Sequence, residues 1–62
     1  MDAYTRSVEL AHIESGMNKL ADTLGAMIEL HRINPDREIV GRLIRAQAKA
    51  KYGAALVREH RP

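Results

Sequence analysis

Few side chains in this sequence are spaced in a way that could support chemistry. Glu9 and His12 have the Glu-x-x-His spacing that holds metal ions in carboxylate-bridged helical bundles. However, their neighbours Leu10 and Ile13 occupy the apolar side of the same helical turn, which leaves Glu9 and His12 on its flank or in solvent. A metal site also needs a fixed shell of supporting groups, and a chain end does not provide one. We therefore predict no metal site and no bound cofactor.

Serine and histidine could also indicate nucleophilic catalysis. The chain contains Ser7, Ser15 and three histidines. No glycine-rich turn presents a serine, and no spacing forces an acid and a base together. The narrow helical architecture predicted below offers no obvious pocket. We expect a protein that is not an enzyme.

The side chains best suited to recognition lie in the second half of the chain. At roughly 100° per residue on a helix, five of them fall in a band roughly 80° wide. We call this band the basic stripe; it consists of Arg42, Arg45, Lys49, Tyr52 and Leu56. Arginine and tyrosine are favoured in the centres of protein interfaces. The alternative is a solvated face, or ion pairing with acids of the first half such as Glu14, Asp22 and Glu29.

Charge is unevenly distributed along the chain. Ten Lys and Arg against eight Asp and Glu give a formal net charge of +2. Residues 1–34 contain three basic and five acidic residues, and residues 35–62 contain seven and three. The basic half could attract phosphate or an acidic protein surface, and oppositely charged helices would also pair well within one hairpin.

Large apolar residues recur in the first half at steps that alternate between three and four. This is the heptad rhythm of a helix that packs against another helix. The members of this seam are Leu10, Ile13, Met17, Leu20, Leu24 and Met27. We therefore predict a first helix over residues 4–33.

A break at Asn34 and Pro35 separates the two halves. Proline disfavours the α conformation of the residue before it, so the first helix must end near Ile33. Asn34 is predicted to cap a second helix over residues 35–60, with Pro35 as its first residue. The seam of this helix has the same rhythm: Ile39, Leu43, Ala46, Ala50, Gly53 and Val57. Folding the chain at the break places Met17 opposite Gly53, so large residues meet small ones.

The sequence thus predicts an all-α protein with one domain, residues 1–62, folded as an antiparallel helical hairpin. A chain this short is marginally stable without disulfides, metal or oligomerisation, and it contains no cysteine. Its apolar face is also wider than one partner helix covers. We expect two hairpins to form a homodimeric four-helix bundle. No run of about 18 apolar residues suggests a membrane span, so we expect a cytoplasmic protein.

Three functions are compatible with these features. We favour a small regulatory or inhibitory protein that acts as a homodimer and binds a protein partner through the basic stripe. Binding to the RNA or DNA backbone is an alternative, although the low net charge and the scarcity of aromatic residues count against it. A third is a structural subunit of a larger assembly, in which Ile44, Ala48 and Ala55 pack against other components.

Overall fold

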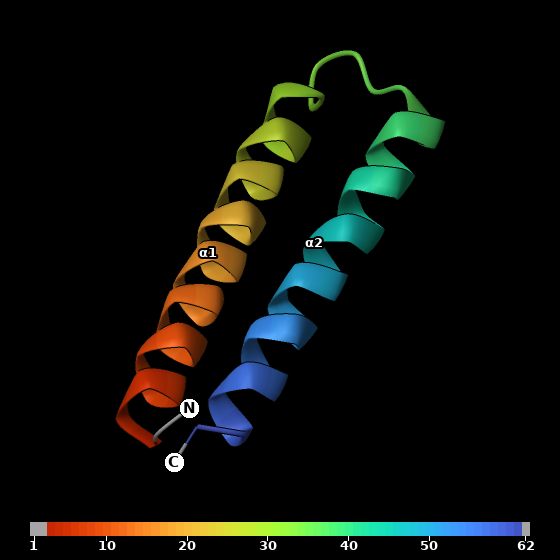
Figure 1. Ribbon diagram of the computed structural model, residues 1–62. Helices are drawn as coiled ribbons and strands as arrows, with labels where there is room; N and C mark the ends of the chain where they lie inside the picture. Colours follow the sequence, from red (N-terminus) through yellow and green to blue (C-terminus); the bar gives the residue numbers. More distant parts are fainter. Residues whose placement is uncertain (1–2, 62) are drawn as a thin grey trace.

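The computed structural model describes residues 3–61, which form two helices. Helix α1 spans Ala3–Leu30 and helix α2 spans Arg37–Glu59. They run antiparallel and pack along their length, with both chain ends at one end of the molecule and the connection at the other (Figure 1). The molecule is a rod with principal extents of 50 × 14 × 13 Å. The prediction of an all-helical hairpin is confirmed, and the described residues contain no strand.

The connection between the helices is longer than predicted. Helix α1 ends at Leu30, so residues 31–36 lie between the helices. Two backbone bonds close the end of α1: the His31 N–H donates to Ile28 O over 3.1 Å, and the Arg32 N–H donates to Glu29 O over 3.2 Å. Such tight last turns satisfy carbonyls that have no partner further along the helix. His31 and Arg32 therefore follow the helix and are not part of it.

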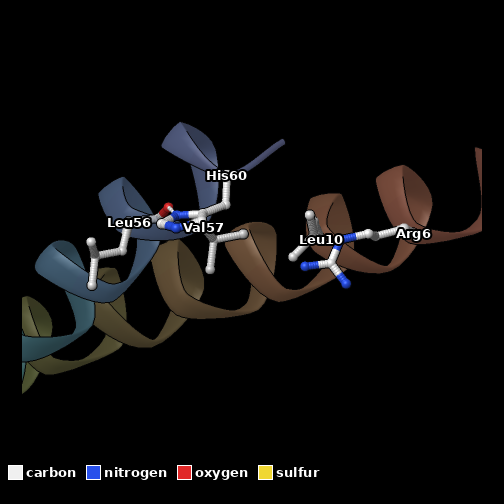
Figure 2. A pocket seen from close by; sticks show the side chains of 5 residues that line it. All are labelled: Arg6, Leu10, Leu56, Val57 and His60. Atoms are coloured by element: carbon white, nitrogen blue, oxygen red, sulfur yellow. Dashed lines mark hydrogen bonds between the residues drawn. The ribbon is translucent and has the colours of Figure 1, made fainter. Parts of the chain in front are cut away.

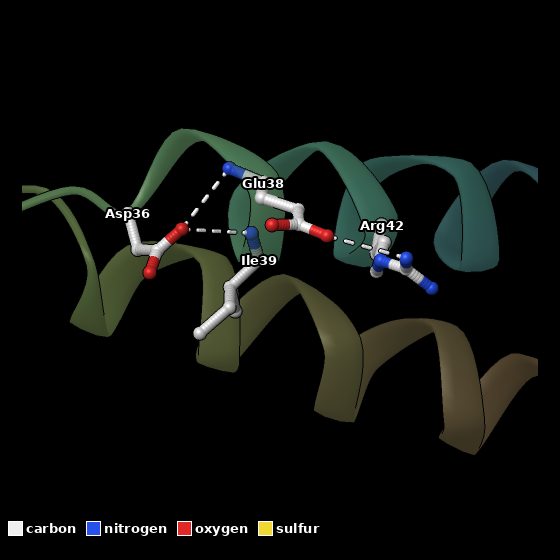
Figure 3. Close-up of polar contacts among 4 residues, drawn as sticks. All are labelled: Asp36, Glu38, Ile39 and Arg42. Atoms are coloured by element: carbon white, nitrogen blue, oxygen red, sulfur yellow. Dashed lines mark hydrogen bonds and ion pairs between the residues drawn. The ribbon is translucent and has the colours of Figure 1, made fainter.

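The residue that caps α2 is Asp36, which corrects the prediction of Asn34 (Figure 3). Asp36 has extended backbone angles, φ −90° and ψ 109°. Its Oδ1 atom accepts from the Glu38 N–H over 3.0 Å and from the Ile39 N–H over 3.2 Å. Pro35 consequently precedes the cap and does not begin the helix. A carboxylate places negative charge at the positive end of the helix dipole, which the neutral amide of Asn34 cannot do.

Small residues bring the two helices close together. Four apolar side chains are buried among the described residues: Ala21, Leu24, Ala50 and Ala54. A Cβ atom built on Gly53 would lie only 2.8 Å from Met17 Sδ, so these two residues face each other as predicted. With so little side chain between the helices, the interior of a single hairpin is small.

One polar side chain crosses this contact. Gln47 Nε2 donates to Ala21 O over 3.1 Å, and the amide is partly buried. A Cβ atom on Gly25 would lie 2.8 Å from Gln47 Nε2. Glycine at position 25 therefore leaves the space that this hydrogen bond occupies. The apolar spacing of the sequence did not indicate it.

The predicted seam of α1 divides into two rows. Leu10, Met17 and Leu24 turn toward α2 and are buried or half-buried. The other three members lie seven residues apart and are 46%, 53% and 43% exposed; we call them the outer row: Ile13, Leu20 and Met27. A single partner helix covers only part of a stripe this wide.

The predicted seam of α2 is covered more completely. Ala50 is buried, and four further members are half-buried: Leu43, Ala46, Gly53 and Val57. Only Ile39, next to the connection, is exposed, at 45%. Neither helix, within the described residues, is long and apolar enough to cross a membrane.

Candidate functional site

The basic stripe lies on the surface of α2. All five of its side chains are exposed, with Tyr52 at 67% and Leu56 at 37%. Arg42 Nη2 contacts Glu38 Oε1 over 3.3 Å, one turn earlier on the same helix (Figure 3). Both of these side chains are about three-quarters exposed, so the pair holds Arg42 only weakly.

The acids of α1 do not neutralise the stripe. Glu14 binds Arg58 and Arg61 near the end of the chain, and Glu29 binds Arg32 over 2.7 Å. In the described part of the chain, the side chains of Arg45, Lys49 and Tyr52 form no hydrogen bond and no ion pair. In the described part of the chain, Glu14 and Glu29 pair with other arginines, and Asp22 forms no ion pair with the stripe.

Glu14 instead joins the two helices at their open end. Its Oε2 accepts from Arg58 Nε over 3.0 Å, and its Oε1 accepts from Arg61 Nη1 over 2.8 Å. The Glu14 side chain is only 14% exposed. The hydrogen bond from Arg61, followed by that from Arg58, lowers the pKa of the Glu14 carboxyl below its usual value of 4.5. Sequence spacing missed this cluster because Glu14 lies more than 40 residues from either arginine.

A shallow hollow of about 230 Å³ connects the stripe to α1 (Figure 2). Leu56 of the stripe lines it together with Val57 and His60 of α2 and with Arg6 and Leu10 of α1. Apolar side chains make its walls, and a guanidinium and an imidazole stand at its edge (Figure 2). The stripe and one side of α1 thus belong to the same face of the hairpin.

The Glu-x-x-His pair of α1 does not line this hollow. Glu9 and His12 are both exposed. Within the described residues, no three side chains of the types that bind metal come together.

The guanidinium groups and the tyrosine of the basic stripe are suited to binding another molecule. A guanidinium binds a carboxylate or a phosphate through a planar fork of N–H groups, and an exposed tyrosine supplies apolar area at low entropic cost. Tyr52 and Leu56 make this face amphipathic as well as basic. No protein-family model, curated protein or solved structure matches this chain.

Proposed function

We propose that this chain is a small, non-enzymatic regulatory or inhibitory protein that acts as a homodimer and binds an acidic surface of a protein partner through the basic stripe. The observation that supports it most directly is that Arg45, Lys49 and Tyr52 have no polar partner in the described part of the chain. Glu14 and Glu29 bind other arginines, and Asp22 forms no ion pair in the described part of the chain. Unpaired donors along one side of a helix are available to an external acceptor.

A protein partner accounts for the stripe better than nucleic acid does. The net charge is only +2, and the chain has two tyrosines and no other aromatic residue. Binding to single strands normally uses several stacking aromatics, and binding to duplexes uses more cations. The apolar hollow beside Leu56 also suits a side chain of a protein better than a phosphate.

The test compares two charge reversals of equal size. The stripe variant is Arg45→Glu with Lys49→Glu. The control is Arg37→Glu with Lys51→Glu, which are exposed on the other flank of α2 and have no ion pair in the described chain. Each protein is immobilised and exposed to a lysate of the native host, once untreated and once treated with nuclease, and bound proteins are identified by mass spectrometry. Affinities are then measured with the purified partner.

We expect at least one protein to be retained by the wild type and by the control. Its affinity for the stripe variant should fall by more than about tenfold, because reversal places like charge against an acidic surface. Equal retention by all three proteins would exclude the stripe as the binding surface. A partner that disappears on nuclease treatment would instead favour binding to nucleic acid.

A further inference from the structure

The outer row of α1 is an apolar surface without a partner in the single hairpin. Ile13, Leu20 and Met27 are each roughly half exposed. We infer that two copies associate through their α1 helices, which run antiparallel and meet at Leu20, so that the two outer rows pack on each other. This inference rests on the homodimer of the proposed function and specifies its geometry.

The single hairpin exposes enough surface for a second copy to cover one of its faces. The 7.0 kDa chain exposes 5027 Å². A compact monomer of this mass is expected to expose about 4,000 Å², which leaves an excess of about 1,000 Å² per copy. Each partner in an interface of standard size contributes about 800 Å². The rod therefore has enough surplus surface for one such contact.

The spacing of the outer row is symmetric, as a two-fold contact requires. Ile13 and Met27 lie seven residues before and after Leu20. An antiparallel pairing at Leu20 places Leu20 against its own copy and Ile13 against Met27 of the other copy. Such self-complementarity defines an isologous interface. The same pairing brings Glu9, which forms no ion pair in the described chain, to the height of His31 of the second copy.

A dimer in which α1 packs on α2 of the second copy would be less favourable for the outer row. A two-fold axis parallel to the helices would lay α1 on α2 of the second copy. The pairing of Met17 with Gly53 sets the heights along the rod, and at these heights Leu20 would meet Lys49 and Met27 would meet Arg42. Covering these apolar side chains would then remove water from unpaired cations. Packing α1 on α1 buries the row on itself and sets no cation of the basic stripe directly against it.

The two ends of the hairpin also complement each other. Leu30 and Ile33, beside the connection, are 82% and 98% exposed. The hollow lined by Leu10, Leu56 and Val57 lies at the opposite end (Figure 2). Antiparallel pairing about Leu20 brings Leu30 of one copy to the height of Leu10 in the other. An exposed apolar end thereby comes to the same height along the rod as an apolar hollow.

Spin labels at three positions test this geometry. The chain lacks cysteine, so single cysteines can be introduced at His12, Lys19 and Ala26, which are exposed and lie seven residues apart on one side of α1. At a rise of 1.5 Å per residue, the axial offset between the two copies should be about 24 Å at 12, about 3 Å at 19 and about 18 Å at 26. Pulsed EPR should therefore give its shortest distance at position 19 and longer ones on both sides. Circular dichroism checks that each labelled protein keeps its helices.

Two results would overturn the inference. Equal distances at all three positions would show a dimer whose axis runs along the helices; the homodimer would stand and this geometry would fall. The absence of any distance between copies at micromolar concentration would remove the homodimer as well. Binding of a partner through the stripe is measured separately and does not depend on either result.

Discussion

Single side chains set the ends of the helices and the bond between them. Asp36 satisfies two backbone N–H groups at the start of α2 with one oxygen atom. Gln47 crosses to the Ala21 carbonyl because Gly25 leaves space for its amide. The cap depends on the Oδ1 atom of Asp36, and the bond between the helices depends on the Nε2 atom of Gln47. Replacing the residue should therefore have a definite and local effect.

The cap gives the first prediction. Asp36→Ala should lower the free energy of unfolding by about 0.5–2 kcal/mol, because two N–H groups lose their acceptor and the helix dipole loses a favourable charge. Asn34→Ala is the matched control and should change it by less than about 0.5 kcal/mol. Urea denaturation followed by circular dichroism measures both. A larger loss for Asn34→Ala than for Asp36→Ala would contradict the cap assignment.

At the scale of the elements, α1 and α2 meet through small residues and are tied by charge at the open end. Ala21, Ala50 and Ala54 let the backbones approach closely. Glu14 binds Arg58 in the last turn of α2 and Arg61, two residues beyond the end of the helix. The close approach of the backbones requires small side chains. The ion pairs of Glu14 connect α1 to Arg58 and Arg61 at the open end of the hairpin. Acid should weaken this tie.

The pH dependence of this tie gives the second prediction. The pKa of Glu14 is lowered in the folded chain, so its stabilisation is present above the unfolded value of 4.5 and is lost as the pH falls through the lower folded value. Glu14→Gln should therefore be less stable than the wild type at about pH 7, and the difference should shrink toward about pH 3. Thermal unfolding across this range measures it. Glu29→Gln, on an exposed pair, should show little change at either pH.

For the whole molecule, a single hairpin leaves much of its apolar surface uncovered. Its described interior contains only four buried apolar side chains. Exposed aliphatic residues occur on α1, on α2 and in the connection. We expect a rod with so small a core to depend on a further contact for much of its stability.

This dependence gives the third prediction. Leu20→Asp should weaken association by more than about 100-fold, or about 2.7 kcal/mol, because two carboxylates would face each other without water. The melting temperature should also fall and lose its dependence on concentration. Ile44→Asp is the matched control: Ile44 is 52% exposed against 53% for Leu20, but it lies on the other flank of α2. Analytical ultracentrifugation should find that control still dimeric, and equal dissociation of both variants would contradict the assigned face.

Periodicity and turn chemistry in the sequence were enough to predict the hairpin. The heptad rhythm of each half defines a stripe relative to its own helix axis, and proline places the break near residue 34. Volume matching then predicted that Met17 faces Gly53, which the structure confirms. These features depend on residues close in the chain or on a regular repeat. They can be read without knowledge of the packed helices.

Only the tertiary structure decided how the helices are rotated against each other. Close contact at Ala21, Ala50 and Ala54 turns one edge of the α1 seam inward and leaves Leu20 in the outer row. The same rotation places Glu14 against Arg58 and Arg61, and in the described part of the chain no acid of α1 contacts the basic stripe. A repeat in the sequence specifies which residues share a stripe. It does not specify how much of that stripe one neighbour covers, because that depends on how closely the two backbones can approach.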